Sequence, residues 1–234
     1  MENTTFSSSL LWMAGIAAIL AGVFIISFAG IASSNNLFFY LEVLEGGSVV
    51  PWIQNVQASP SVAGFIMALP ILGFSCFLIV AIVLYQYIRE TSWQKNLSLG
   101  SYLIGVPVTI VMWILQLSLM NYVLLNYGKS PEMNVHIEGL ASYLLYFFHV
   151  TNEIFGPLLI IVLGASMMAW AALKAGVLPK WLCYWAIACG ALLLLSFLSV
   201  INPAFRILSF AAPLHMLWFI VLGVILIRRA TAKN

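Results

Sequence analysis

The chain has 234 residues, of which 63% are hydrophobic and 7% are charged, and its mean hydropathy is +1.07. Soluble domains carry about a quarter charged residues, so this composition excludes a soluble protein and indicates an integral membrane protein in contact with the lipid bilayer. The net charge of +2 is too small to indicate nucleic acid as a partner.

Apolar runs that are long enough to cross a membrane occur six times along the chain. A hydrocarbon core of about 30 Å takes about 20 helical residues. The runs cover residues 10–32, 61–88, 98–126, 141–173, 181–201 and 207–227, and segments with polar residues, Gly or Pro separate them. The sequence therefore predicts an all-α polytopic fold, in which residues 1–234 form a single transmembrane domain built as a six-helix bundle.

The first run is expected to stay in the protein as a membrane helix. The residues before it include Glu2 and no Lys or Arg, and the run is longer than the about 7–15 apolar residues of a secretion signal. An even number of spans then puts both termini on the same side of the membrane.

The distribution of Lys and Arg predicts which side this is, because cytoplasmic loops are enriched in both. If the termini are inside, only Lys129 and Arg206 lie outside, and the other basic residues lie in the cytoplasm: Arg89, Lys95, Lys174, Lys180, Arg228, Arg229 and Lys233. We therefore expect a multi-pass protein of a cell membrane with both termini cytoplasmic.

The segment 33–60, between the first two spans, is long for a connection and far from polar. Loops of this length without structure of their own are uncommon. We therefore expect it to be partly structured, with a short interfacial helix near Leu37 to Leu44. Such a segment would either act as a lid or cover helix ends on the outer face.

Small residues recur at four-residue spacing in the first and fifth runs, at Ala14, Ala18 and Gly22 and at Ala186 and Gly190. Small side chains let helix backbones approach closely. These positions are predicted packing seams, and they would serve a homodimer equally well.

The run 141–173 has two ionisable side chains in its interior, His149 and Glu153, and it is the only one of the six runs with an acid there. Tyr146, His149 and Glu153 follow one another at spacings of three and four and so share a helix face, with Asn152 on its flank. Ionisable residues at this depth are costly and usually face protein or a water-filled cavity. This face is therefore the first candidate for a functional site.

Polar residues of two other helices are expected in the same outer half of the membrane. At a rise of 1.5 Å per residue, His149 and His215 both lie about 12 Å below the outer ends of their helices, and Gln116 lies about 15 Å below its own. Asn121 lies about 7 Å from that end, and Arg206 stands at the mouth. The sequence thus predicts a polar pocket that opens outward, with these residues as its lining.

Four interpretations of the pocket stay open. It could bind or transport a small or amphipathic ligand, with Glu153 as an exchangeable acid and Arg206 attracting anions. It could hold a metal such as zinc on His149, Glu153 and His215 and act as a membrane hydrolase. It could hold a single b-type haem between His149 and His215, or the polar network could only set helix register in a structural protein without a ligand. Whether the protein is an enzyme is therefore open.

The run that starts at Ile154 has Phe155-Gly156 near the middle of a helix and a loop from Gly176 to Lys180, and the last helix ends in Arg228-Arg229. In these features, mainly within residues 154–200 and the C-terminal helix, the chain resembles a bacterial family of six-helix membrane proteins of unknown function. Cys183 departs from the small residue, usually Gly, that the family has after Trp-Leu. The resemblance implies six spans and a bacterial cytoplasmic membrane, and it implies no activity or ligand.

Overall fold

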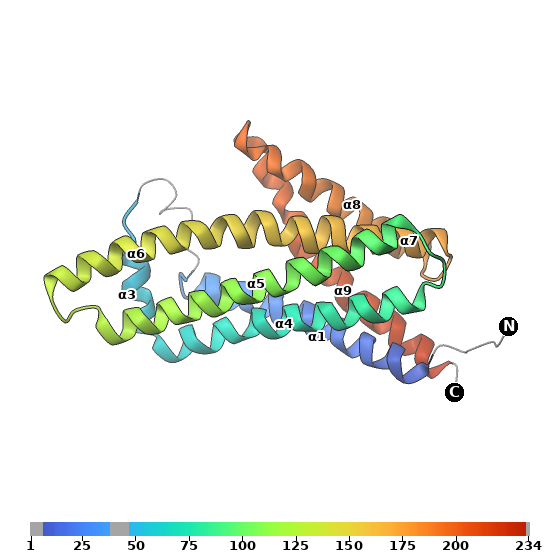
Figure 1. Ribbon diagram of the computed structural model, residues 1–234, viewed down its shortest axis with the longest axis horizontal. Coiled ribbons are helices and arrows are strands. Elements are labelled where there is room, and N and C mark those ends of the chain that lie inside the picture. Colours follow the sequence, from blue (N-terminus) through green and yellow to red (C-terminus); the bar gives the residue numbers. More distant parts are fainter. Residues whose placement is uncertain (1–6, 38–46, 233–234) are drawn as a thin grey trace.

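The computed structural model describes residues 7–37 and 47–232, without the side chains of Glu153, Val200 and Pro203. The regular elements of these ranges are all helices (Figure 1). The elements of the first half are α1 (Ser8–Ser34), α3 (Val50–Ala58), α4 (Pro60–Tyr87) and α5 (Trp93–Asn126). The rest are α6 (Pro131–His149), η1 (Val150–Phe155), η2 (Leu158–Ser166), α7 (Met167–Lys174), α8 (Lys180–Ser196), η3 (Phe197–Val200), η4 (Pro203–Phe210) and α9 (Ala211–Thr231).

Five helices in the described ranges are long and apolar enough to cross a membrane: Ser8–Ser34, Pro60–Tyr87, Trp93–Asn126, Lys180–Ser199 and Ala204–Thr231. This confirms the predicted all-α, polytopic membrane protein. The remaining predicted run, 141–173, lies within the helical stretch from α6 to α7, where two π-helical segments interrupt the α-helix.

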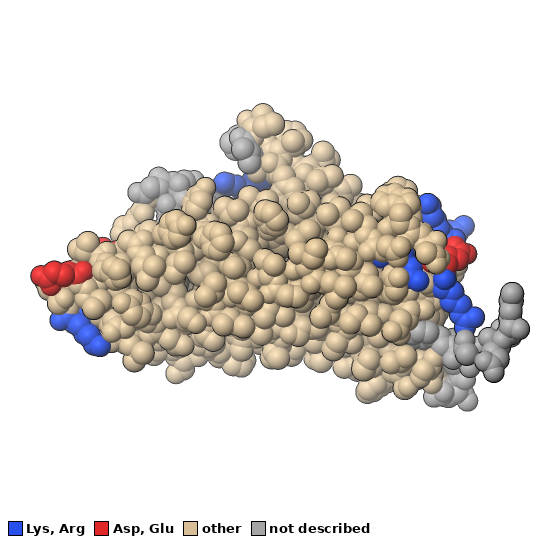
Figure 2. All heavy atoms as spheres, in the orientation of Figure 1, with Lys and Arg blue, Asp and Glu red and all other residues tan. Residues whose placement is uncertain are grey.

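The long helices α4, α5 and α6 to α7 run side by side along the long axis, and α8 and α9 lean across it (Figure 1). On the face in Figure 2, most charged side chains lie near the two ends of this axis, and the middle is almost entirely uncharged. An uncharged belt between charged ends is the surface that a bilayer requires, because charges at its centre are costly.

Two helices start earlier than the sequence predicted, because polar side chains cap them ahead of their apolar runs. The Ser92 hydroxyl accepts a hydrogen bond from the Lys95 amide at 3.3 Å, and α5 begins at Trp93 instead of residue 98. The Ser130 hydroxyl accepts from the Met133 amide at 3.2 Å, and α6 begins at Pro131 instead of residue 141. With 34 residues, α5 is about 51 Å long at 1.5 Å per residue and so exceeds the hydrocarbon core.

Two hydrophobic cores follow one another along the long axis. The α9 core is built mainly by α1, α4, η2, α7, α8 and α9. The α3 core is built by the end of α1, by α3, by the start of α4, by the second half of α5 and by α6. The helix α3 places Trp52, Ile53 and Val56 in this second core. The interfacial helix predicted near Leu37 to Leu44 falls almost entirely on residues 38–46, outside the described residues.

The predicted packing seams lie between helices of this one chain. A Cβ on Gly22 would lie 2.7 Å from the Met216 carbonyl oxygen of α9, and a Cβ on Gly190 would lie 2.9 Å from the Cβ of Ser166 in η2. Only glycine allows such close approach. Gly22 and Gly190 are thus both used inside the bundle.

Candidate functional site

The helix with the predicted ionisable face departs from α-helical geometry at that face. His149 is the last residue of α6, and Asn152 and Glu153 lie in the π-helix η1. Pro157 follows directly after Gly156 and lacks the N–H that would continue the α-helical ladder. Segments of π-helix are rare and are often found at functional sites, so the chain has its irregular backbone where the sequence places its polar residues.

Close contacts set the register between this helix and α5. The Ser98 hydroxyl donates a hydrogen bond to the Gly164 carbonyl at 2.7 Å, and a Cβ on Gly105 would lie 2.8 Å from the Leu159 Cβ. One turn further, a Cβ on Gly156 would lie 3.3 Å from the Thr109 Oγ1. The two helices are therefore antiparallel.

Continuing this antiparallel register places two residues of α5, Trp113 and Gln116, at the level of Asn152 and His149. The packing of α5 on η1 agrees with this placement. The Trp113 ring is held from a third helix, since it lies edge-on to Phe28 of α1 with 4.7 Å between the ring centroids.

Polar side chains gather in this interface. Thr109, Trp113 and Gln116 follow at spacings of four and three on one face of α5, and their exposed fractions are 1%, 5% and 0%. Asn152 of η1 is half-buried, with both amide atoms shielded from solvent. We call these four residues the α5–η1 cluster.

None of the six polar side-chain atoms of the α5–η1 cluster has a hydrogen-bond partner among the described groups. They are Thr109 Oγ1, Trp113 Nε1 and the amide nitrogen and oxygen of Gln116 and of Asn152. A buried group that loses its partner costs about 1–3 kcal/mol, and most buried polar groups in proteins are paired. Four such side chains on two packed helices therefore need an explanation, and a bound polar group would supply one.

The other predicted site residues of this region lie near the cluster or on the surface. His149 is half-buried at the end of α6, and the Glu153 backbone follows Asn152 in η1, while its side chain is outside the described part. Tyr146 has 55% of its surface exposed. Asn121 and Arg206 are also exposed. The structure thus brings Gln116, His149 and Asn152 to one level of one interface.

His215 lies in a different core. It is fully buried on α9, with its ring centroid 5.0 Å from that of Trp218 and 5.5 Å from that of Phe219. Phe219 packs on Phe77 of α4 at 4.4 Å, and the Trp218 indole donates to the Leu182 carbonyl of α8 at 2.8 Å. Over the described ranges, α9 makes no extensive contact with α6 or η1. His149 and His215, which were predicted at equal depth, thus lie on helices that are not packed extensively on each other.

No group of three His, Cys, Asp or Glu side chains in the described part of the chain could hold a metal ion. The predicted trio of His149, Glu153 and His215 includes the Glu153 side chain, which is outside that part. What the structure does place is His215, in the α9 core among aromatic rings.

Thr109 and Trp113 were missed by sequence reasoning. Neither residue is ionisable, and a search for intramembrane charges passes over them. Their spacing from Gln116 is the signal that could have found them, because residues at i, i+4 and i+7 share one helix face.

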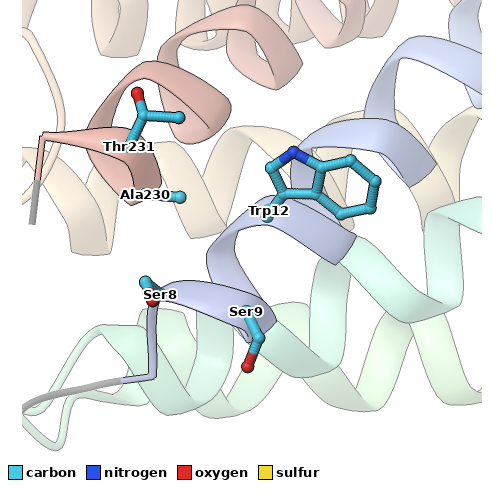
Figure 3. Close-up of a pocket in the computed structure, with 5 residues that line it drawn as sticks. All are labelled: Ser8, Ser9, Trp12, Ala230 and Thr231. Atoms are coloured by element: carbon cyan, nitrogen blue, oxygen red, sulfur yellow. The ribbon is translucent and has the colours of Figure 1, made fainter. Parts of the chain in front are cut away.

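A shallow hollow of about 240 Å³ lies at the end of the molecule where α1 begins and α9 ends (Figures 1 and 3). Its lining is Ser8, Ser9, Trp12, Ala230 and Thr231. These side chains supply hydroxyl groups and one indole, but no acid, base or charge. The hollow therefore has less to recognise a ligand than the α5–η1 cluster.

A family model described as "Domain of unknown function (DUF4386)" matches residues 13–230, which is most of the chain. The matched range begins within α1 and ends within α9, so it contains both cores and the α5–η1 cluster. No curated protein and no solved structure matches the chain.

Proposed function

We propose that this chain, which belongs to the DUF4386 family, binds or transports a small or amphipathic molecule at the α5–η1 cluster, within the membrane. The proposed contacts are Thr109, Trp113, Gln116 and Asn152, with His149 and Glu153 beside them. Glu153 would be the exchangeable acid of this site.

The observation that carries the proposal is the set of six buried polar atoms without a hydrogen-bond partner among the described groups. Inside a membrane no bulk water is at hand to solvate such groups, so leaving them unpaired is costly. A ligand with its own donors and acceptors would pair them. The π-helix beside them supports the same conclusion, since irregular backbone at membrane depth is tolerated where it is buried in protein or lines a cavity.

We propose a six-span topology for the bundle, with both termini in the cytoplasm of a bacterial cell and α3 on the outer side. The helical stretch from α6 to α7 would be the sixth span, and it contains the shorter apolar helix Leu158–Lys174. Ser8 and Thr231 line the same hollow, as expected when an even number of spans brings both termini to one side. Cysteine labelling in intact cells tests this: an impermeant maleimide should modify a Lys129→Cys variant, and a Lys233→Cys variant only after permeabilisation.

The zinc and haem hypotheses are not favoured by the packing. Both require His149 and His215 to share one site, and His215 lies among the rings of Trp218 and Phe219 in the α9 core. We therefore assign the proposed function to the α5–η1 cluster without a metal or a haem.

The test is to compare molecules that co-purify with the protein and with variants of the site. Gln116→Leu and Asn152→Leu remove a donor and an acceptor each and keep the approximate size of the side chain. Mass spectrometry of extracts should find a species that is enriched with the wild-type protein and lost from both variants. Asn121→Leu, on the exposed face of the same helix, is the matched control and should retain it.

A result in which wild type, site variants and control carry the same molecules in the same amounts would overturn the proposal. The comparison does not depend on a loss of folding, because exchanging an unpaired buried amide for an apolar side chain of similar shape is nearly neutral or stabilising.

A further inference from the structure

The chemistry of the α5–η1 cluster indicates what kind of polar group it takes, and this inference rests on the function proposed above. Trp113 Nε1 can only donate a hydrogen bond, and the Thr109 hydroxyl can donate and accept. The carboxamides of Gln116 and Asn152 each offer an acceptor oxygen and an NH₂ donor. The four side chains are all uncharged and together present donors and acceptors in a mixed set.

An anionic group would lack a countercharge at this site. Between Lys95 and Asn126, α5 contains no Lys or Arg, and neither does the stretch from Pro131 to Leu173. Arg206 is exposed in η4, and Lys95 donates to the Ile88 carbonyl near the other end of the molecule. A buried charge without a partner is strongly disfavoured.

A cationic group would satisfy only part of the cluster. It could donate to the oxygens of Thr109, Gln116 and Asn152, but it cannot accept a hydrogen bond. The Trp113 N–H and the two amide NH₂ groups would stay unpaired. An uncharged group with both donors and acceptors is the type that can pair all of them.

The surroundings of the cluster suit an apolar chain attached to such a group. On the outer face of α5, Val111, Ile114 and Leu115 are exposed, and so are Phe147 and Phe155 on the partner helix. In a bilayer these faces meet lipid chains. A hydrocarbon tail could therefore extend from the cluster along surfaces that already lie in an apolar environment.

We propose that the α5–η1 cluster binds the uncharged, hydroxyl- or amide-bearing headgroup of a single-chain amphiphile. Such a headgroup pairs the donors of Trp113, Gln116 and Asn152 as well as the acceptors beside them. The site would discriminate against fatty acids and alkylammonium compounds of the same chain length.

The experiment uses the full-length protein in phosphatidylcholine nanodiscs and four probes with the same oleyl or oleoyl chain. Monoolein and oleamide have uncharged headgroups, oleate is kept ionised by a mildly alkaline buffer, and oleylammonium is the cation. A ligand that binds only the folded state raises the unfolding temperature. We expect a rise with monoolein or oleamide that grows with probe concentration, and none with the two charged probes.

The Gln116→Leu, Asn152→Leu double variant should lose this rise, and Asn121→Leu should keep it. A rise with oleate or oleylammonium that exceeds the rise with both uncharged probes, and that is lost in the double variant, would overturn the headgroup assignment and leave the proposed function standing. The absence of a rise with both uncharged probes would also overturn the assignment. The proposed function itself is tested separately, by mass spectrometry of the co-purified molecules. It would fail if no co-purified species were lost from the Gln116→Leu and Asn152→Leu variants.

Discussion

Buried hydroxyl and indole groups differ in their hydrogen bonding between the two regions of this protein. In and around the α9 core, three of them donate to backbone carbonyls: Ser98 to Gly164 at 2.7 Å, Ser166 to Ala186 at 2.9 Å and Trp218 to Leu182 at 2.8 Å. The His215 imidazole is the exception there, since neither of its ring nitrogens has a partner among the described groups. In the α5–η1 cluster, Thr109, Trp113, Gln116 and Asn152 are buried beside the α3 core without such partners in the described residues.

A polar side chain can therefore be buried in this bundle and still have a hydrogen-bond partner. A serine or an indole in the α9 core pairs with a carbonyl of a neighbouring helix, which shows what the fold provides where a side chain serves packing alone. The polar groups of the α5–η1 cluster have no such partner among the described residues, although α5 takes part in both regions. In the described part of the chain, the cluster thus differs from the α9 core in having four unpaired polar side chains, whereas the α9 core has one, His215.

The largest expected change in the free energy of unfolding comes from adding a Cβ where two helices pack closely. Gly22→Ala would put a Cβ 2.6 Å from Ile220 Cγ1 and 2.7 Å from the Met216 carbonyl oxygen. Because a backbone atom has to move, we expect a loss of about 2–3 kcal/mol in the free energy of unfolding, in the upper range for overpacked cores. Gly156→Ala, with its Cβ 3.3 Å from Thr109 Oγ1, should cost less than about 1 kcal/mol on the same scale.

Denaturant unfolding in detergent micelles measures both variants. Gly30→Ala, on α1 as is Gly22, has no atom within 4 Å of its added Cβ and is the control. It should be neutral or stabilising by up to about 1 kcal/mol, since Ala favours helix over Gly. Equal losses for Gly22→Ala and Gly156→Ala would contradict the difference in packing.

The next prediction is a gain in the free energy of unfolding, in contrast to the loss expected for Gly22→Ala. Gln116→Leu should raise the free energy of unfolding by about 1 kcal/mol in protein stripped of bound small molecules, because an unpaired buried amide is removed. Asn121→Leu on the exposed face should change it by no more than about 0.5 kcal/mol. A marked loss of stability in Gln116→Leu would mean that its amide is paired within the protein, and the cluster would then resemble the α9 core.

The paired groups of the α9 core should respond the other way. Ser166 donates to the carbonyls of Ile161 and Ala186, so Ser166→Ala should lower the free energy of unfolding by about 0.6 kcal/mol, the average for hydrogen bonds between membrane helices. Denaturant unfolding of the same preparations gives the comparison with Gln116→Leu. Stabilisation by Ser166→Ala would remove the contrast between the two regions.

The smallest effect lies at the edge of the α3 core, where the Tyr127 hydroxyl donates to Glu138 Oε1 at 2.7 Å between the end of α5 and α6. This hydrogen bond, with burial and the Glu138 charge, raises the pKa of Tyr127 above its ordinary value of 10.0. A raised pKa in the folded state means that the contribution to stability is complete below pH about 10 and is lost as the pH rises through the folded-state pKa.

The difference in unfolding temperature between wild type and Tyr127→Phe should therefore be constant from neutral to mildly alkaline pH and vanish in strong alkali. Its size corresponds to less than about 0.5 kcal/mol, as for most surface substitutions. A difference that grows with rising pH would contradict the assignment.

Helix boundaries could be predicted where local hydrophobicity sets them, and could not be predicted where contacts of the folded chain set them. The end of α5 at Asn126 coincides with the end of its predicted apolar run, because hydrophobicity stops there. Its start does not, because Ser92 caps the helix and Lys95 reaches the Ile88 carbonyl, which are contacts of the folded chain. No periodic pattern in the sequence predicts the π-helical segments η1 and η2. Gly156-Pro157 is the local hint of an irregular backbone.

The candidate site was predictable in the same partial way. The polar face of the run 141–173 and Gln116 could be found, because polar residues stand out in apolar runs. His215 was grouped with them by depth alone, and depth along a helix does not tell which neighbour its side chain meets. Thr109 and Trp113 became site candidates only when the packing of α5 on η1 was known.

The sequence by itself determined that this protein is an all-helical membrane protein and where its long apolar helices lie. These properties depend on the transfer of each segment from water to the hydrocarbon core, which is close to a sum over residues in one stretch of chain. Only the tertiary structure decided that Gln116 and Asn152 share an interface while His215 lies in the α9 core. That outcome depends on helix rotation and on close approach at residues such as Gly22, Gly105 and Gly156, and it is a property of pairs of helices.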